Sequence, residues 1–378
     1  MSDSFKCRVC SENIYPFMSF GEMPLGNGFK DPGQKEKEYK FEMRVAVCEN
    51  CSTFQLIDQP EPEKMFHDEY AFFSGTSKRM AEHFKQFASE VNKEVKGDSK
   101  EKFVVEIGSN DGILIGNFAK LGISHLGIEP SSNVAKVAIS KGINTKVSFF
   151  SKEIAQKVTK QYGKADALMA ANVICHIPTI KDIAEGVGKI LKDDGIFVFE
   201  EPYLGDVLEK ITYDQIYDEH VFLFSLTSVN EIFNSVGMEI FRAENQWTHG
   251  GSMRYWISRK GKRHIEQSVK SLIKYENDLG IRDPKTFINF KKSCEEQKLK
   301  LFNILEDLRK RKKRVVGYGA TSKSTTILNY CGIKAHHIEF ISDTTPIKQG
   351  KLTPGTNIPV KAYKSFKDKY PEYVLLFA

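Results

Sequence analysis

Between residues 103 and 202, short apolar runs alternate with helix-like segments, and this alternation constrains the fold more than any other feature. The runs read FVVEIG, HLGIEP, ADALMAANVI and GIFVFEEP, and each ends in a turn or polar signal. The segments SSNVAKVAISKG and IKDIAEGVGKILKDD between them have helical spacing. Because parallel strands need helical crossovers, this order indicates a parallel sheet with helices on both faces. We therefore expect an α/β fold.

Further segments extend this pattern in both directions. Residues from about 70 to 100 have helical periodicity, and MEIFRAENQ and SMRYWISRK alternate around a THGG turn. Such alternation predicts an antiparallel hairpin that closes the sheet. Residues 262–313 form a long, highly charged helical stretch, which we interpret as a connector.

After the connector, RVVGYGATSKSTTILNYCG and IEFISDTTP repeat the order of strand, glycine turn, helix and strand. This repeat predicts a second, Rossmann-like unit of the nucleotide-binding type. The chain then stops at YVLLFA, an apolar run with the character of a strand. Ending there suggests that part of this unit is missing.

Two Cys-x-x-Cys pairs lie near the N-terminus, at Cys7 and Cys10 and at Cys48 and Cys51. Four thiolates from two such knuckles can close a tetrahedron around Zn²⁺, and the chelate replaces the core that so short a segment lacks. The alternative is unligated or redox cysteines. We expect a structural zinc site, because four thiolates leave no open position for a substrate.

The length of the chain predicts two or three domains, because 378 residues exceed one ordinary core. We place a zinc-binding module at 1–65, a cofactor-binding domain at 66–260, and the connector with the second unit at 261–378. Seven cysteines, an odd count, favour a reducing compartment. The N-terminus lacks a signal-peptide pattern and no window has the apolar length of a membrane span, so we expect a cytoplasmic protein.

The formal net charge of +6 is concentrated in short runs such as RKRKKR at 309–314. A run of this kind attracts phosphates of nucleic acid, a nucleotide or a membrane. The alternative is a solvated helix end, where cations are also favourable.

The first apolar run ends in a glycine turn, VVEIGSNDG, where a buried strand becomes a helix. Glycines let the backbone approach a ligand, and the N–H groups of a helix start await an acceptor. Glu129 ends the next strand, a suitable place for a carboxylate that accepts from ribose hydroxyls. The turn predicts a nucleoside-binding site.

The chemistry of this turn discriminates between nucleosides. Its pattern is E-x-G-x-x-x-G rather than the G-x-G-x-x-G of dinucleotide sites. Carboxylates there suit the ammonium and sulfonium groups of S-adenosylmethionine (SAM) and suit a pyrophosphate badly. The predicted cofactor-binding residues are Glu106, Gly108, Ser109, Asn110, Asp111, Gly112, Glu129, Pro130 and Asn172.

A second glycine turn, GYGATSK at 317–323, has only part of the fingerprint of a site for nicotinamide adenine dinucleotide (NAD), because Ser322 replaces the third glycine. Lys323, just inside the helix, could instead hold a phosphate of a nucleotide-linked substrate. A merely structural turn is the third interpretation. We take Tyr318 and Lys323 as candidate substrate-binding residues.

The stretch YDQIYDEHVFLFS at 213–225 gathers phenols, carboxylates and an imidazole in front of an apolar tail. On a surface helix such a run is a solvated face, whereas in a cleft the same groups could move protons. It follows the GIFVFEEP run, at the carboxyl edge of the predicted sheet, where substrates bind in α/β proteins. We therefore favour the cleft.

Seven motifs, taken in order from Cys7 to Val360, resemble those of the SAM-dependent nucleotide-sugar C-methyltransferases. They are the paired Cys-x-x-Cys, VVEIGSNDG, ANVICHIP, YDQIYDEHVFLFS, THGGSMRYW, GYGATSKSTTILNYCG and SDTTPIKQGKLTPGTNIPV. The resemblance implies a class I methyltransferase Rossmann-like domain, a small N-terminal zinc-binding domain and a C-terminal Rossmann-like domain that helps hold the nucleotide sugar. It also implies methylation at C3 of a 4-keto-hexose nucleotide through an enolate.

The family's catalytic residues map onto this sequence at five positions. The resemblance makes His220 the base, with Tyr217 and Glu219 beside it, while Tyr70 and His176 line the same pocket. The chemistry agrees, because a proton next to a ketone is only weakly acidic and its removal needs a base near neutrality and donors for the enolate oxygen. Alternatively, Glu219 orients a neighbour or binds substrate, and His176 is a core histidine.

Other functions compete with this interpretation. A sugar O-methyltransferase or an NAD-dependent nucleotide-sugar enzyme would use the second glycine turn, and a zinc-containing RNA-binding methyltransferase would use the cysteines and the basic run. The cysteine segment lacks the basic and aromatic clustering of RNA-binding modules. We therefore expect SAM and zinc as cofactors, a nucleotide sugar as substrate, no nucleic-acid or membrane partner, and a monomer.

Overall fold

The computed structural model describes residues 4–34, 36–65, 75, 77–365 and 370–377. Its central sheet has seven strands in the order β12-β13-β10-β9-β6-β7-β8. The strands are β6 (Phe103–Ile107), β7 (Ser124–Glu129), β8 (Thr145–Val147), β9 (Ala165–Ala171), β10 (Leu191–Pro202), β12 (Met238–Gln246) and β13 (Ser252–Arg259). Strands β6 to β10 are parallel to one another, and β13 is antiparallel to both β10 and β12. The predicted parallel sheet and its closing hairpin are confirmed.

Helices cover both faces of this sheet. Adjacent residues of a strand point to opposite sides, so a strand that is apolar throughout needs a helix layer on each side. Val105 packs in the core with α5 (Lys152–Tyr162), α6 (Ile180–Ile190) and α8 (Leu226–Asn234). Its neighbour Val104 packs with α2 (Lys78–Glu94), α3 (Gly116–Lys120) and α4 (Ser132–Ser140). The helix expected from about 70 to 100 corresponds to α2, which is shorter and begins after the N-cap Ser77.

The N-terminal part forms an antiparallel sheet in the order β11-β5-β4-β3. Its strands are β3 (Pro16–Pro24), β4 (Lys40–Val47), β5 (Phe54–Leu56) and β11 (Phe222–Leu223), preceded by the pair β1 (Phe5–Lys6) and β2 (Asn13–Ile14) and followed by α1 (Pro62–Met65). Strand β11 comes from the stretch after the central domain's α7 (Leu204–Lys210) and pairs with β5. The domain limits 1–65, 66–260 and 261–378 stay a prediction, and this sheet crosses the first of them.

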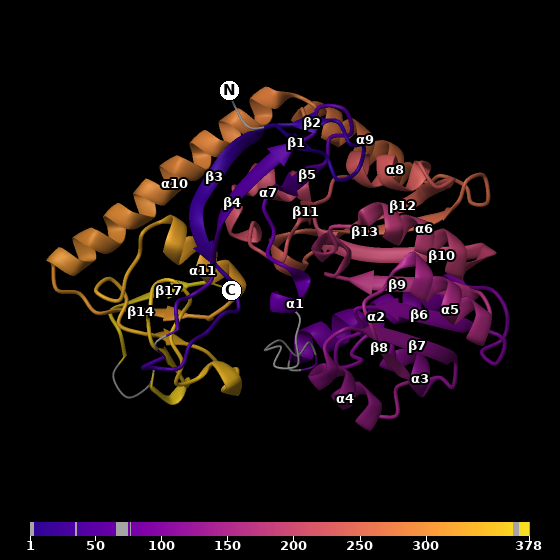
Figure 1. Cartoon of the computed structure of the whole chain (residues 1–378), viewed down its shortest axis with the longest axis horizontal. Helices are drawn as coiled ribbons and strands as arrows, with labels where there is room; N and C mark the ends of the chain where they lie inside the picture. The colour runs from indigo at the N-terminus through magenta and orange to yellow at the C-terminus, as the bar shows by residue number, and fades with distance from the viewer. Residues whose placement is uncertain (1–3, 35, 66–74, 76, 366–369, 378) are drawn as a thin grey trace.

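The charged stretch 262–313 forms two helices, α9 (Gln267–Leu279) and α10 (Pro284–Lys310). They separate because Gly280 takes a left-handed conformation with a φ of 73° and Pro284 opens the next helix. In Figure 1, α10 runs along the upper left edge of the molecule, from α9 beside the central domain to the C-terminal unit that begins with β14.

The C-terminal unit is a parallel sheet in the order β16-β15-β14-β17. It contains β14 (Val315–Tyr318), α11 (Ser322–Tyr330), β15 (Ile341–Ser342), β16 (Val360–Lys361) and β17 (Tyr373–Leu376). The expected strand, glycine turn, helix and strand are confirmed. Within the described part of the chain, no helix combines the length and the apolar character needed to cross a membrane.

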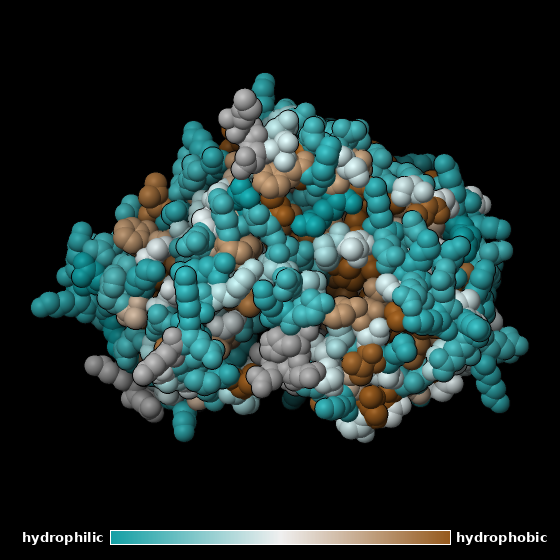
Figure 2. Space-filling view, viewed as in Figure 1, coloured by the Kyte–Doolittle hydropathy of each residue, from teal (hydrophilic) through white to brown (hydrophobic). Residues whose placement is uncertain are grey.

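The basic run 309–314 lies at the C-terminal end of α10 and pairs with nearby acids. Arg309 contacts Glu306 at 2.6 Å, and Arg314 contacts Glu339 at 2.6 Å. This matches the solvated helix end, where cations are stabilised by the helix dipole. On the face shown in Figure 2, the described surface is mainly hydrophilic, with small, scattered hydrophobic patches.

The three parts meet at Gly26, in the loop after β3. Its N–H donates to Asp218 Oδ1 at 3.0 Å, and its carbonyl accepts from Thr325 Oγ1 of α11 at 2.9 Å. A Cβ at this position would lie 2.7 Å from Asp218 Oδ1 and 2.9 Å from Ser322 Cβ. Only glycine lets the backbone approach both neighbours so closely.

We predict that Gly26→Ala destabilises the protein by about 1–3 kcal/mol, as overpacking of a filled site does. The matched control is Gly188→Ala within α6, where a Cβ would have nothing within 4 Å. That change should be neutral or stabilising by up to about 1 kcal/mol, because alanine is the better helix former. Thermal unfolding midpoints test this, and equal midpoints for wild type and Gly26→Ala would contradict the tight junction.

Candidate functional site

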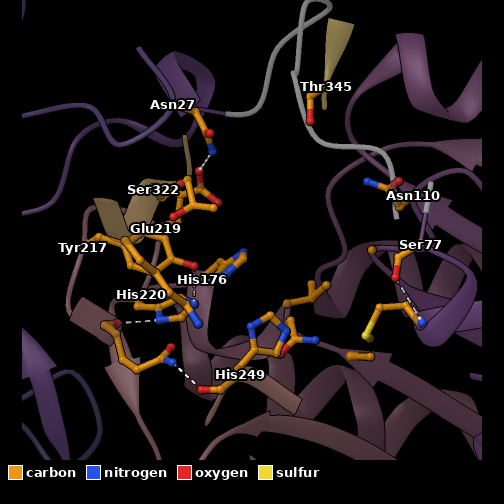
Figure 3. A pocket seen from close by; sticks show the side chains of 18 of the residues that line it. Asn27, Ser77, Asn110, His176, Tyr217, Glu219, His220, His249, Ser322 and Thr345 are labelled. Carbon is orange, nitrogen blue, oxygen red and sulfur yellow. Dashed lines mark hydrogen bonds between the residues drawn. The ribbon is translucent and has the colours of Figure 1, made fainter. Parts of the chain in front are cut away.

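A cavity of about 1100 Å³ lies where the three parts meet (Figure 3). Its walls come from the carboxyl ends of β6, β7 and β9, from the 212–220 stretch, from the turn after β12 and from the C-terminal unit. Asn27, next to the Gly26 junction, also lines it. The 213–225 stretch is therefore not a surface helix. It forms a buried 3-10 turn at Tyr213–Gln215 followed by β11, and the cleft interpretation is confirmed.

The hydrogen-bond partners of its two ring nitrogens hold His220 in one tautomer. Nδ1 lies 2.7 Å from the carbonyl oxygen of Gln215, which can only accept, so Nδ1 carries the proton. Nε2 lies 2.7 Å from the Tyr217 hydroxyl and is then the acceptor of that hydrogen bond. Burial, and then the nearby His176, lower the pKa of His220 well below its ordinary value. The ring is neutral, with its lone pair at Nε2.

Two more histidines face the same cavity. The ring of His176 stacks on that of His220, with centroids 5.3 Å apart. Burial lowers the pKa of His176 to about 3 and that of His249 to about 4. Figure 3 shows the three rings close together on one side of the cavity. All three imidazoles are neutral near pH 7, so each offers one N–H donor and one acceptor.

A buried carboxylate positions the turn that carries His176. Glu201 Oε1, at the end of β10, accepts from the N–H groups of Val173 at 2.9 Å and Ile174 at 2.7 Å. Burial raises the pKa of Glu201 to about 7. Since His176 lies in the cavity wall, a core role alone does not describe it.

The acidic residues of the 213–220 stretch are fixed by the N-terminal loop. Asn27 Nδ2 donates to Glu219 Oε1 at 2.7 Å, beside the bond between Gly26 and Asp218. Burial, and then the adjacent Glu219, raise the pKa of Asp218 to about 8. Of the five residues predicted to be catalytic, Tyr217, Glu219, His220 and His176 line the cavity. The fifth, Tyr70, lies outside the described residues.

The first glycine turn builds the opposite wall. Five predicted cofactor residues line the cavity: Gly108, Asn110, Glu129, Pro130 and Asn172. Gly108 has a φ of 64°, and a Cβ there would lie 2.3 Å from Val173 Cγ2. Glu129 holds this turn by accepting from the backbone N–H of Asn110 at 2.9 Å.

The other four predicted cofactor residues, Glu106, Ser109, Asp111 and Gly112, are not among those that line the cavity. Glu106 turns inward and accepts from the Ile115 N–H at 2.8 Å, while Asp111 pairs with Lys141 at 3.2 Å. A Cβ at Gly112 would lie 2.2 Å from Ile143 Cδ1, so this glycine serves helix packing. These residues shape the turn rather than its surface.

The turn fits SAM by its charge and by an unmet hydrogen bond. Burial raises the pKa of Glu106 well above its ordinary value, and the nearby Glu129 and Asp111 raise it further. Of these three acidic residues, Glu129 lines the cavity, where it would face a cationic ligand. The buried Asn172 Oδ1, at the end of β9, has no hydrogen-bond partner among the described residues. It would accept from a bound ligand.

The predicted substrate residues Tyr318 and Lys323 line the end of the cavity that belongs to the C-terminal unit. Lys348 also lines it, and its ammonium donates to the carbonyl of Ala320 at 2.8 Å. Burial lowers the pKa of both lysines, while Asp214 raises that of Lys323 and Asp343 that of Lys348. This end of the cavity therefore presents two cations.

The four cysteines form a compact cluster in the N-terminal part. Their sulfur atoms all lie within 4.8 Å of one another, with Cys10 and Cys48 at 3.3 Å and Cys7 and Cys51 at 3.5 Å. A tetrahedral zinc with four thiolates needs sulfur separations of about 3.8 Å. Gln55 Nε2 donates to Cys7 Sγ at 3.2 Å, as expected for a thiolate ligand. The cluster fits Zn²⁺.

Asn27, His249 and Lys348 are among the cavity residues that were not identified in the sequence. Asn27 and Lys348 lie in loops without a motif, and only the fold brings them near the 213–220 stretch. His249 did have a signal, because a histidine inside a glycine-rich hairpin turn is an unusual choice where only a turn is needed.

Comparisons with known proteins agree with this geometry. Three family models match the chain: a zinc binding domain at 7–66, a methyltransferase domain at 78–243 and a C-methyltransferase C-terminal domain at 247–378. The C-methyltransferase NovU of Streptomyces niveus is 30% identical over 376 residues, which are 99% of this chain and 89% of that protein.

Solved structures are less similar. Magnesium protoporphyrin IX methyltransferase ChlM from Synechocystis PCC 6803 is 15% identical and covers 48% of this chain and 83% of its own, with a TM-score of 0.38. The PH0226 protein from Pyrococcus horikoshii OT3 is 13% identical and covers 54% of this chain and 100% of its own, with a TM-score of 0.40. These low scores leave the fold assignment to the strand order and the family models.

The strand order, the edge hairpin and the matched methyltransferase domain confirm the predicted class I methyltransferase fold. The cofactors predicted from the sequence, SAM and zinc, are likewise confirmed by the methyltransferase and zinc-binding models and by the cysteine cluster. The chain belongs to the family of SAM-dependent C-methyltransferases that carry an N-terminal zinc-binding domain.

Proposed function

We propose that the protein methylates C3 of a 4-keto-hexose linked to a nucleotide, with His220 as the base. The observation that carries this proposal is the fixed tautomer of His220, which presents a neutral Nε2 lone pair at the cavity. A C-methyltransferase needs a carbon nucleophile, and the carbon next to a ketone becomes one once its proton is removed.

The residues around His220 serve the proton transfer. Nε2 takes the proton of the substrate C–H bond, and the electron pair of that bond moves to form the enolate. The Tyr217 hydroxyl, which occupies Nε2 in the free enzyme, turns to donate to the substrate. The Gln215 carbonyl stabilises the imidazolium through Nδ1–H. Glu219, held by Asn27, orients the sugar hydroxyls.

SAM, when bound, would supply the methyl group that the enolate carbon attacks; the bond between sulfur and the methyl carbon breaks, and S-adenosylhomocysteine leaves. Gly108, Asn110, Glu129 and Asn172 hold it on the wall opposite the histidines. Because this wall and the base belong to one cavity, the substrate carbon and the methyl group can be bound side by side.

The C-terminal end of the cavity supports a nucleotide-linked substrate. Lys323 and Lys348 place two ammonium groups there, and phosphate groups are the anions that such a pair attracts. A volume of about 1100 Å³ exceeds the need of one small ligand and suits two large ones together.

Mass spectrometry of reactions with SAM and several 4-keto nucleotide sugars tests the proposal. We expect one product with the mass of one added methyl group, on carbon by its NMR spectrum. If none of the sugars gains a methyl group, the proposed substrate class is wrong.

His220→Asn should abolish deuterium exchange at the carbon next to the ketone, because the amide cannot act as a base there. Exchange is measured in D₂O with S-adenosylhomocysteine bound, so that no methyl transfer follows. The matched control is His264→Asn at an exposed histidine, which should exchange at the wild-type rate. Full exchange by His220→Asn would remove His220 from the base role.

The lowered pKa of His220 predicts an unusual pH profile. Its neutral, active form persists below pH 6.5, because protonation requires a lower pH than for a free histidine. We therefore expect kcat/KM at pH 6 to stay close to its value at pH 8. A base with an ordinary pKa of about 6.5 would lose about fourfold over that range. Glu201 and Asp218, with pKa values of about 7 and about 8, titrate in the same range. Such a loss, present also in Glu201→Gln and in Asp218→Asn, would contradict the neutral, buried base.

A further inference from the structure

The turn between β12 and β13 holds a strained histidine. His249 has a φ of 53° and a ψ of 26°, in the left-handed region that is uncommon for residues other than glycine, although histidine adopts it more often than most. Gly250 and Gly251 follow it directly and could have carried the turn. Strain of this kind persists where the surroundings enforce it, and it clusters at functional sites.

The surroundings of this turn do enforce it. The Gln215 side-chain amide donates a short hydrogen bond to the carbonyl of His249, and the same Gln215 accepts from His220 Nδ1 through its own carbonyl. Lys210 Nζ donates to the Gly250 carbonyl at 2.7 Å. One residue, Gln215, thus ties the backbone of His249 to the imidazole of His220.

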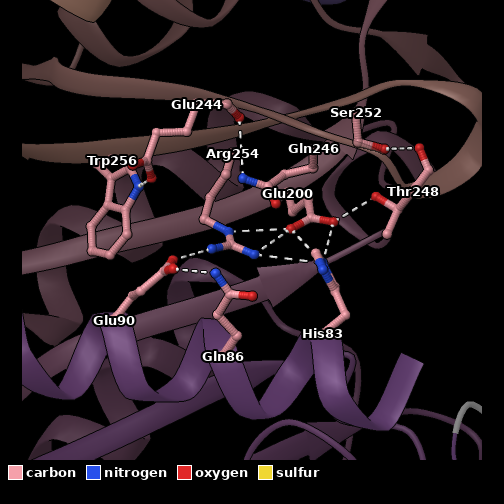
Figure 4. Close-up of polar contacts among 10 residues, drawn as sticks. All are labelled: His83, Gln86, Glu90, Glu200, Glu244, Gln246, Thr248, Ser252, Arg254 and Trp256. Carbon is pink, nitrogen blue, oxygen red and sulfur yellow. Dashed lines mark hydrogen bonds and ion pairs between the residues drawn. The ribbon is translucent and has the colours of Figure 1, made fainter. Parts of the chain in front are cut away.

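A buried ionic network fixes the turn from below (Figure 4). Thr248 Oγ1 donates to Glu200 Oε1 at 2.7 Å, and Arg254 holds Glu200 Oε2 at 2.8 Å. His83 of α2 adds a contact to Glu200 Oε1 at 2.8 Å. Glu200 and Arg254 are buried, and taking such charges out of water is costly unless they are fully paired. This network holds Thr248, the residue that directly precedes His249.

The ring of His249 lines the cavity, within electrostatic reach of Glu200 and His83 of this network. Figure 3 shows it beside His176 and His220, on the wall that carries the base. Burial, and then the positive Lys323, keep His249 neutral, so it offers an N–H to a ligand without adding charge. A neutral donor next to the base lies where the ketone oxygen becomes negative.

We propose that His249 is a further catalytic residue, which donates a hydrogen bond to the ketone oxygen of the substrate as the enolate forms. This inference rests on the proposed function. Gln215 links the backbone of His249 to the imidazole of His220, so that the donor residue and the base are positioned by one residue. Preorganised donors of this type contribute more than flexible ones, because they need no rearrangement during the reaction.

Two variants separate the catalytic role from a structural one. His249→Gly relieves the left-handed strain and removes the imidazole, whereas His249→Asn tolerates the same conformation and keeps a short amide. We expect both to fold, with an unfolding midpoint for His249→Gly equal to or above that of the wild type. Deuterium exchange next to the ketone should fall about 100-fold in each, the usual cost of losing one such donor. Added imidazole should partly restore exchange in His249→Gly.

The control is His264→Asn, which should keep the wild-type rate, midpoint and KM values. Exchange within twofold of wild type in both His249 variants would overturn the inference. So would a raised KM for SAM with unchanged exchange, because His249 would then belong to the cofactor site. If the wild type catalyses no exchange with any keto sugar, both the proposed function and this inference are wrong. If the wild type catalyses exchange and both His249 variants match its rate, only this inference is wrong.

Discussion

The hydrogen bond between the Gly26 N–H and Asp218 holds the stretch that carries His220, the proposed base. It ties the N-terminal loop to the 213–220 stretch, and the same loop residue accepts from Thr325 of the C-terminal unit. Asp218 is buried beside Glu219, and burial raises its pKa to about 8, so this carboxylate is costly to place. The backbone N–H of Gly26 offsets this desolvation cost by donating to Asp218. The two groups can approach each other this closely only because residue 26 is glycine.

This constraint explains why a zinc cluster belongs to the active protein although it lies outside the cavity. The N-terminal sheet is small, and its fourth strand, β11, comes directly after His220. A chelate of four thiolates gives the module the rigidity that its own core cannot provide. The rigid module then holds two points of the base-bearing stretch, through Gly26 before it and β5 after it. We therefore expect zinc to support the site by holding this stretch in place rather than by taking part in the reaction.

Patterns that are local in the sequence predicted most of the fold. The β/α alternation, the hairpin and the repeated glycine turn depend on periodicity within 10–20 residues, and each was found in the structure. The connector's break at Gly280 was missed, because one glycine does not by itself end a helical pattern. Strand β11 was also missed, since two residues pairing with β5 leave no periodic signal.

The residues of the candidate site also divide into those that local sequence patterns identified and those that only the fold brings together. The turn at Gly108 and the motif around His220 were recognisable because their chemistry is written in adjacent residues. Glu106 was expected at the cofactor surface, but a carboxylate within a strand can face either side, and this one binds the Ile115 N–H. Asn27 and Lys348 meet the cavity across more than a hundred residues of chain, a separation that only the folded topology closes.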